Sequence, residues 1–203
     1  MQDYFDATDE PSQQIPYMYH YANKPGLSTQ RSRLVIAQLF NTSTNGLPGN
    51  DDSGKLSILQ TSVAQVFSGA MGSYAFFYLA GMYPVPATQQ FLLSSPFFPS
   101  ISFTNPVLNT TTTIKANNFN GNPTDGKSGN VFVKVGIQVT IACITEESQS
   151  VTVNGSPYKS NCYLDWDVFT AGSTVVLELT NDIGVTCGSG SALPPSLSTG
   201  GYD

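Results

Sequence analysis

The sequence predicts an α+β protein in which helices precede a region of short antiparallel strands. Composition favours a folded core, because 40% of the 203 residues are hydrophobic and 11% are aromatic, whereas only 11% are charged. The pattern changes near residue 90, with helical spacing of apolar residues before it and strand-like runs after it. We therefore expect helices in residues 1–90 and strands in residues 91–203.

Three segments before residue 90 have the features of helices. Pro11 opens the first, PSQQIPYMYHYA, and Ser28 can cap the second, STQRSRLVIAQLFN. The third, AMGSYAFFYLAGMYPV, is apolar nearly all round, so we expect it to be buried and to be ended by Pro84.

The runs after residue 90 are rich in Val, Ile, Thr and Phe, and turn residues separate them. They are FLLSS, SISF, TTTTIKANN, NVFVKV, SVTVNGSPY and STVVLELT. Asn154-Gly155 is the strongest hairpin signal in the chain. Together these runs predict an antiparallel, β-sandwich-like region.

Charge and composition exclude several classes of function. With 8 basic against 14 acidic residues the net charge is −6, so we expect no nucleic-acid partner. No stretch approaches the roughly 18 apolar residues of a membrane helix, so we expect no membrane contact. The N-terminal residues also lack the basic and apolar regions of a signal peptide. Residues 49–55 resemble the start of a nucleotide-binding loop, but Leu56 stands where Ser or Thr must bind magnesium.

The acidic loop of residues 46–54 is the strongest candidate for chemistry. Asn50, Asp51 and Asp52 can bind a metal, a water or a sugar hydroxyl, and a carboxylate in such a loop can act as general base. The alternative is a solvated turn in which these side chains cap their own backbone. A second acidic pair, Asp9-Glu10, precedes the first helix, where carboxylates also interact favourably with the helix dipole.

Two other residues have a structural and a functional interpretation. The only histidine, His20, lies among tyrosines, and we expect it to pack against them rather than to bind a metal. Trp166 could stack on a sugar ring, but a place in the core is the favoured interpretation.

Four stretches in order carry a resemblance to glycoside hydrolase family 92, a family of α-mannosidases. They are EPSQQIPYMYHYANKPG, GLPGNDDSG, AMGSYAFFYLAGMYPV and LLSSPFFPSISF, and the later SVTVNGSPYKSNCYLDWDVFTAGSTVVLELT looks like the closing strands of the family. The resemblance spans nearly the whole chain but covers only the C-terminal part of such an enzyme. It implies that residues 1–90 are the last helices of a catalytic (α/α) toroid.

The resemblance also implies a function and its residues. It implies a calcium-dependent, inverting exo-α-mannosidase of α-1,2 type that acts on mannose-containing oligosaccharides of N-glycans. Asp52 matches the general base, with Asn50 and Asp51 in the same loop, and Glu10 matches a residue that lines the sugar site. Asp9 stands where many members have Asn and is the candidate metal ligand.

The general acid of the family lies upstream of these motifs, which implies that this chain is inactive alone. We also expect the full-length parent to be secreted. The alternative function is that of a non-catalytic carbohydrate-binding β-sandwich module. A longer reading frame upstream of Met1 would favour the enzyme.

Two segments, residues 55–69 and 135–149, interrupt the family pattern and are predicted inserts, which we interpret as retained introns of fungal size. Cys143 lies in the second insert, so its removal leaves Cys162 and Cys187 as an expected disulfide. Three Asn-x-Ser/Thr sequons, at Asn41, Asn109 and Asn154, agree with a secreted context.

Overall fold

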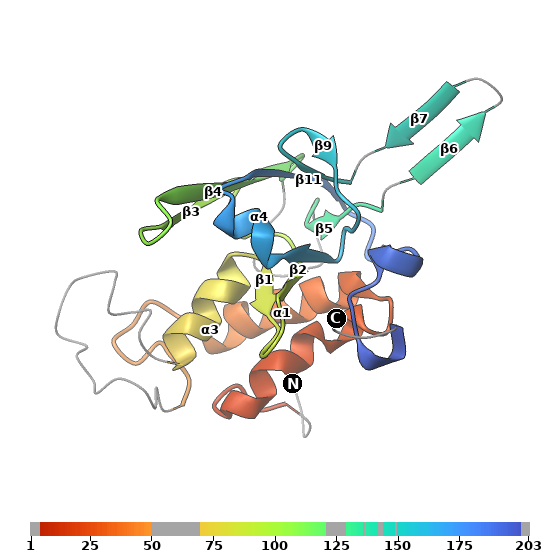
Figure 1. Cartoon of the computed structure of the whole chain (residues 1–203). Helices are drawn as coiled ribbons and strands as arrows, with labels where there is room; N and C mark the ends of the chain where they lie inside the picture. Colours follow the sequence, from red (N-terminus) through yellow and green to blue (C-terminus); the bar gives the residue numbers. More distant parts are fainter. Residues whose placement is uncertain are drawn as a thin grey trace.

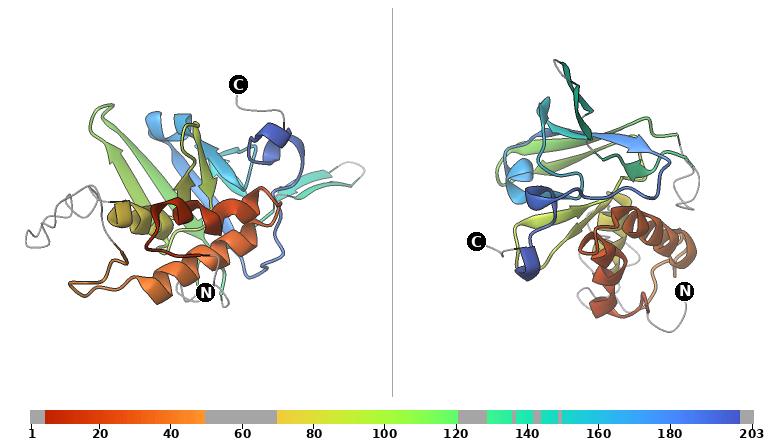
Figure 2. Two further views of the ribbon diagram at one scale, coloured as in Figure 1. Left: turned by 90° about the horizontal axis from the view of Figure 1, so that it is seen from below. Right: turned by 90° about the vertical axis from the view of Figure 1, so that its right-hand side faces the viewer.

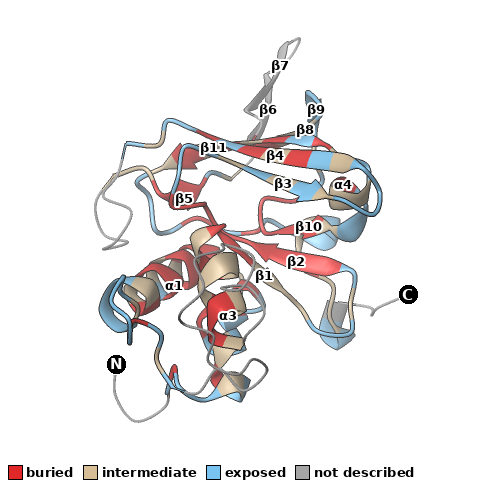
Figure 3. Ribbon diagram, turned by 90° about the vertical axis from the view of Figure 1, so that its left-hand side faces the viewer, coloured by how far each residue is buried: buried red, intermediate tan, exposed pale blue. Residues whose placement is uncertain are grey.

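Helices and two β-sheets are stacked in three layers in the computed structural model of this chain (Figure 1). The structure describes residues 5–49, 70–120, 129–135, 137–141, 144–148 and 150–199. The helices form one outer layer, a small sheet forms the middle layer, and a larger sheet forms the other outer layer (Figure 3). The α+β class predicted from the sequence is confirmed.

The first helix, η1 (Glu10–His20), is a 3-10 helix that contains two prolines. Pro11 stands in the first turn, where its missing N–H would have no partner in any case. Pro16 stands inside the helix and removes a hydrogen-bond donor there, which favours the tighter 3-10 winding over an α-helix.

The second helix, α1 (Pro25–Leu39), begins earlier than the sequence predicted. Pro25, whose φ is already suited to a helix, occupies its first turn, and Ser28 is a buried interior residue rather than the cap. Gly26 lets the helix approach the C-terminal part of the chain, since a Cβ there would lie 2.1 Å from the carbonyl oxygen of Ile183. The last helix of this layer, α3 (Ala70–Leu79), ends before the predicted Pro84.

Within the described ranges, the middle layer is a three-stranded antiparallel sheet of order β1-β2-β10. Its strands are β1 (Met82–Pro84), β2 (Gln90–Leu93) and β10 (Tyr163–Asp165). β1 lies in the part of the sequence that was expected to be helical. The sheet therefore joins the β1-β2 hairpin, which follows α3, to β10, a strand from far along the chain.

The outer sheet of the described residues has six strands, with the order β3-β4-β11-β8-β9 and with β5 also on β11. They are β3 (Ser100–Asn105), β4 (Thr110–Asn117), β5 (Phe132–Val133), β8 (Val151–Val153), β9 (Ser156–Pro157) and β11 (Thr174–Thr180). β11 runs parallel to β4, so this sheet is mixed rather than wholly antiparallel as expected. The predicted hairpin at Asn154-Gly155 joins β8 to β9, with φ of 52° and 80°.

β5 and β8 lie end to end along the same edge of β11. The N–H of Lys134 donates to the carbonyl oxygen of Glu178 at 2.8 Å, and the N–H of Glu178 donates to the carbonyl oxygen of Ser150 at 2.8 Å. Lys134 and Ser150 thus stand opposite the same residue. Between them, β6 (Ile137–Ile141) and β7 (Ile144–Ser148) pair only with each other among the described strands and project from the body (Figure 1).

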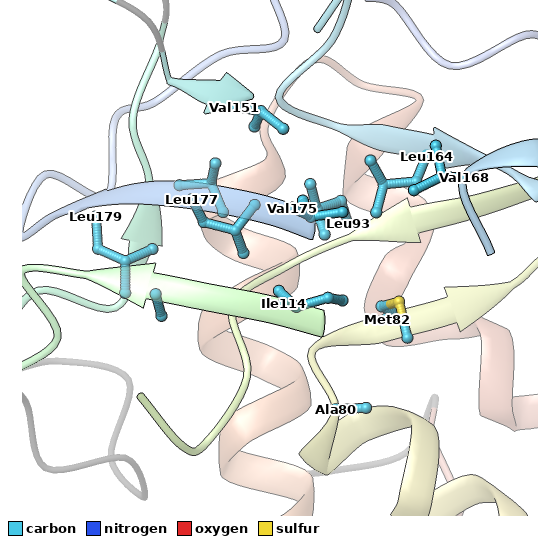
Figure 4. Close-up of a cluster of buried hydrophobic side chains, with 12 residues drawn as sticks. Ala80, Met82, Leu93, Ile114, Val151, Leu164, Val168, Val175, Leu177 and Leu179 are labelled. Carbon is cyan, nitrogen blue, oxygen red and sulfur yellow. The ribbon is translucent and has the colours of Figure 1, made fainter. Parts of the chain in front are cut away.

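Of the buried hydrophobic clusters in the described residues, the two largest lie between the layers. The larger lies between the two sheets, where Met82, Leu93 and Leu164 of the middle sheet meet Ile114 and Leu177 of the outer one (Figure 4). The second lies between the helices and the other face of the middle sheet, and it consists of Ala7, Tyr17, Val35, Met71, Tyr74, Tyr78, Leu92 and Tyr163. The middle sheet is thus covered on both faces.

The C-terminal part of the chain returns across the layers. It includes α4 (Trp166–Thr170) before β11 and the short 3-10 helices η2 (Gly190–Ala192) and η3 (Leu197–Thr199) after it. Figure 2 shows η2 and η3, drawn in blue, beside the edge of the middle sheet. Among the described residues, no helix is long and apolar enough to cross a membrane.

Candidate functional site

The acidic segment before η1 is organised by its own hydrogen bonds. Asp9 is the extended residue at the helix start, and its carboxylate accepts a hydrogen bond from the hydroxyl of Ser12 at 3.2 Å. Asp6 accepts hydrogen bonds from the hydroxyl and the N–H of Thr8 at 2.7 and 2.8 Å, and these bonds lower the pKa of its carboxyl group. Asp6 is a third acidic residue of this segment that motif reasoning did not single out.

Gly49, the residue before the predicted catalytic loop, packs directly against this segment. A Cβ at Gly49 would lie 2.8 Å from the Cα of Thr8, and its φ of +70° also favours glycine. The loop that leads to Gly49 is closed by backbone hydrogen bonds from Asn41 to Gly46 at 2.9 Å and from Gly46 to Ser43 at 3.0 Å. Asn50, Asp51 and Asp52 lie outside the described residues, as does the predicted insert 55–69. The structure therefore brings the residue before Asn50 next to the residue before Asp9.

Three tyrosines pack against one another at the contact between η1 and α3. The hydroxyl of Tyr78 on α3 donates to the carbonyl oxygen of Gln13 at 2.6 Å, which ties α3 to η1. The ring of Tyr78 packs edge-on against Tyr17 and Tyr74, with centroids 5.1 and 4.3 Å away. Burial raises the pKa of all three phenols above the ordinary value, so they stay neutral.

His20 is a structural residue of the helical layer, as the sequence predicted. Its ring is fully buried and lies nearly parallel to Tyr17, with centroids 5.7 Å apart. Nε2 donates to the carbonyl oxygen of Leu93 at 2.9 Å, and Nδ1 lies 2.8 Å from the hydroxyl of Ser28 and 3.1 Å from the carbonyl oxygen of Tyr17. Burial lowers the pKa of His20 to about 4.

Arg33 is a buried cation that sequence reasoning missed. Its guanidinium donates to the carbonyl oxygens of Ser95 at 3.1 Å and Pro96 at 2.8 Å, and it lies 4.3 Å from the centroid of the Phe97 ring. These contacts fasten α1 to the segment after β2. No periodic signal distinguishes this arginine from an exposed one on the same helix.

A groove of about 400 Å³ is another candidate binding site. Aromatic rings from α3, β2, β3 and α4 line most of it, including Phe76, Phe103 and Trp166. Trp166 stacks on Phe91 with centroids 5.7 Å apart and is 45% exposed. The preference for a core tryptophan is therefore wrong, because α4 is a single short turn at the surface of the sheet.

The donor chemistry of the acidic segments suits calcium, which prefers carboxylate and amide oxygens. Asp9 is exposed and Glu10 is half-buried, and both lie at the start of η1. In the part of the chain that the structure describes, no three His, Cys, Asp or Glu residues cluster as a metal site would require. Further ligands would have to come from the loop at Asn50 or from other parts of a longer protein.

Cys162 and Cys187 form a disulfide, the pairing expected from the sequence. It joins the start of β10 to the segment that follows β11. The N–H of Cys187 also donates to the side chain of Asn23 at 2.7 Å, just before α1. The C-terminal segment is thereby held against both the sheet and the helices.

Comparison with known families gives one match over most of the chain. Residues 1–61 and 68–181 match the family model described as glycosyl hydrolase family 92 catalytic domain. The unmatched residues 62–67 lie within the predicted insert 55–69, whereas residues 135–149 lie inside the matched range.

A similar curated protein is an uncharacterized secreted glycosidase of Arthroderma benhamiae. It is 32% identical over 192 residues, which are 95% of this chain and 20% of that protein. The chain thus spans about a fifth of the length of this relative.

The solved structures that are similar give the same picture of the fold. The family GH92 alpha-mannosidase BT3965 from Bacteroides thetaiotaomicron aligns with a TM-score of 0.68 and 22% identity, over 97% of this chain and 22% of that one. BT3965 has also been solved in complex with mannoimidazole. The inverting mannosidase BT2199 of the same organism aligns with a TM-score of 0.58 and 18% identity, over 86% of this chain and 19% of that one.

Proposed function

Because this chain belongs to glycosyl hydrolase family 92, we propose that it is the C-terminal part of a calcium-dependent, inverting exo-α-mannosidase. Its substrates would be mannose-containing oligosaccharides of N-glycans, with α-1,2 linkages. The family membership and the mannosidase neighbours of similar fold support this proposal.

In the proposed reaction, Asp52 is the general base. Inversion requires one carboxylic acid to protonate the leaving oxygen and one carboxylate to deprotonate a water on the opposite face of the sugar, roughly 6.5–9.5 Å away. Asn50 and Asp51 would orient this water and the sugar, and Glu10 would bind a sugar hydroxyl. The acid would come from an upstream part of a full-length enzyme, so the chain alone carries one half of the site.

Calcium, when bound, would hold hydroxyl groups of the mannose. Asp9 is the proposed ligand from the described residues, because its carboxylate is exposed and fixed by Ser12 on one oxygen only. The chain's own contribution is to orient Asp9 and Glu10 at the start of η1.

The contact between Gly49 and Thr8 is the observation that carries this proposal. Two segments that the family resemblance assigns to one sugar site, 9–10 and 50–52, are about forty residues apart in the sequence. The contact holds Gly49, the residue before the second segment, against Thr8, the residue before the first.

The parent enzyme is proposed to be secreted. A relative is named a secreted glycosidase, and the disulfide between Cys162 and Cys187 suits an oxidising compartment.

Release of mannose from a manno-oligosaccharide tests the proposal, with calcium and with a chelator. The chain alone should release none above background. A full-length, insert-free version should release mannose only with calcium, and Asp52→Asn should lower its kcat by about 10²–10⁴-fold. Asp167→Asn, an exposed carboxylate on α4, is the matched control and should leave kcat unchanged. Calcium-dependent release by the chain alone would contradict the half-site, and an active Asp52→Asn enzyme would contradict the base.

The alternative function, non-catalytic carbohydrate binding, is favoured by one observation, the half-exposed Trp166 in the aromatic groove. Trp166 is the only tryptophan of the chain, so its fluorescence reports on the groove alone. A blue shift on titration with mannobiose, retained in Asp52→Asn, would favour the binding module. An unchanged emission spectrum would remove this alternative.

A further inference from the structure

Two of the three sequons stand on hairpin turns with nearly the same backbone. Asn109 closes the turn between β3 and β4 with φ of 51°, and Asn154 opens the turn between β8 and β9 with φ of 52°. Both residues are exposed. The pair therefore allows a matched comparison of what each side chain does. The third sequon, at Asn41, stands outside the hairpins, in a local turn where its Oδ1 accepts from the N–H of Ser43 at 2.9 Å.

The side chain of Asn154 is used by the fold. Its Oδ1 accepts a hydrogen bond from the N–H of Thr174 at 2.8 Å, and its Nδ2 lies 3.4 Å from the hydroxyl of Ser173. Ser173 is buried. A sugar on Nδ2 would point toward this buried residue and would break the contacts that fix the start of β11.

The side chain of Asn109 has no such use. The turn is held instead by Asn105, whose Oδ1 accepts from the N–H groups of Val107 at 2.9 Å and Leu108 at 3.1 Å. In the described structure Asn109 makes no side-chain hydrogen bond. Its left-handed backbone ends the turn at the tip of the green hairpin in Figure 1.

The same tip exposes apolar surface. Val107 is 88% exposed and Leu108 is 48% exposed, next to Asn109 in the sequence. Adjacent exposed apolar side chains are a liability for solubility unless something covers them. An oligosaccharide on Asn109 would shield both.

We propose that Asn109 carries an N-linked oligosaccharide and that Asn154 does not, an inference that rests on the proposed secretion of the parent. The donor is a lipid-diphosphate-linked oligosaccharide. Nδ2 of Asn109 forms a bond to C1 of the first sugar while the bond from C1 to the diphosphate oxygen breaks. The lipid diphosphate leaves with that electron pair, and one Nδ2 proton is lost. Thr111 supplies the hydroxyl of the sequon, at the start of β4.

To test this, the full chain is expressed in yeast behind a cleavable secretory leader. Its glycans are then removed enzymatically in H₂¹⁸O, which leaves an ¹⁸O label on each Asn that carried one, and mass spectrometry maps the label at each sequon. The Asn109 peptide should carry the label in most molecules and the Asn154 peptide in few. Thr111→Ala should abolish the Asn109 label, whereas Thr111→Ser, which keeps the sequon and the hydroxyl, should retain it. These variants leave Asn109 itself and its turn unchanged.

An unlabelled Asn109 peptide in protein recovered from the secretory lumen or the medium would overturn the inference, as would an Asn154 peptide that takes up the label only when the glycan-removing enzyme is present. Failure of the proposed secretion is a separate result, because it is found by locating the native protein in the source organism's cells or medium. Expression behind the secretory leader tests the glycosylation of Asn109 whether or not the native protein is secreted.

Discussion

The ring of His20 is bonded through both nitrogens inside the helical layer, to Ser28 and to the carbonyl of Leu93. Protonation would place a charge in a fully buried site, and this desolvation outweighs the two carbonyl oxygens, of Leu93 and Tyr17, that face the ring nitrogens at 2.9 and 3.1 Å. The pKa of His20 falls to about 4 in the folded state, against 6.5 in the unfolded chain. Between these values the unfolded chain binds more protons, so the free energy of unfolding decreases as the pH falls.

We therefore expect the contribution of His20 to stability to be complete above pH 6.5 and to be lost progressively between pH 6.5 and pH 4, by up to ~3 kcal/mol. Melting temperatures measured across this range should show the loss. His20→Gln, which removes the titrating group, should flatten the profile in this window. An equally steep profile in the variant would assign the acid sensitivity to other groups.

Glycine is required at Gly155 by its backbone conformation alone, and at Gly49 by its backbone conformation and by a close neighbour. Both have a positive φ, +70° and +80°, but a Cβ at Gly49 would meet Thr8 whereas nothing lies within 4 Å of one at Gly155. Gly155→Ala should lower the free energy of unfolding by about 1 kcal/mol from its backbone alone. Gly49→Ala should lower the free energy of unfolding by the same backbone cost and by about 1–3 kcal/mol more, because its Cβ would overpack against Thr8. Urea unfolding measures both, and equal losses would deny the contact with Thr8.

At the residue scale, the sequence predicted the roles that local pattern controls. His20 belongs to this class, as does the start of η1, which was predicted at Pro11 and lies at Glu10. The exposure of Trp166 and the burial of Arg33 depend on partners far along the chain, which no local spacing encodes. The roles of Asp9, Glu10 and Asp52 remain predictions from the family pattern.

Elements were predictable where short-range signals agree, as at the Asn154-Gly155 hairpin. The start of α1 was misplaced, because Pro25 already has a helical φ and Ser28 is used by His20 instead. The strand β1 was missed because its apolar residues continue the helical run before it. Its pairing with β2 outweighs that local pattern.

The end-to-end arrangement of β5 and β8 predicts how the sheet responds to deletion of residues 135–149. The deletion joins Lys134 to Ser150, which already lie opposite Glu178, so the two residues can form a β-bulge in one continuous strand. We expect the variant to fold, with a melting temperature no lower than that of the full chain. It should also lose the thiol of Cys143.

Two longer deletions test the register. Deletion of 134–149 places Ser150 opposite Glu178 without a bulge and should also be tolerated. Deletion of 134–150 shifts Val151 by one position, and a one-residue slip turns its buried side chain to the other face. Circular dichroism and thermal unfolding should show loss of cooperativity for this variant alone. Equal behaviour of all three would mean that β5 and β8 are not parts of one strand.

At the scale of the molecule, the disulfide closes a loop between residues 25 positions apart and holds the C-terminal segment against the helices. Replacing Cys162 and Cys187 by Ser should lower the free energy of unfolding by about 3–4 kcal/mol. Reduction of the unmodified chain should lower its melting temperature to that of the double variant. A reduced chain with the original melting temperature would show that the packing alone holds this segment.

The class and the order of helices before strands could be predicted because composition and periodicity change along the chain. The three-layer stacking could not, since β10 joins β2 and β11 joins β4 across large sequence separations. Such pairings depend on complementary faces rather than on any local signal.

The position of β11 has a consequence for the order of folding during synthesis. β11 lies between β4 and β8 in the outer sheet and also pairs with β5, yet it is the last of the strands to leave the ribosome. The earlier strands must therefore wait unpaired along one edge until residue 180 has emerged. Long-range pairing of this kind makes folding slow and exposes the waiting edges to association with other chains. A nascent chain stalled before Thr174 should accordingly bind chaperones, and release should coincide with the emergence of β11.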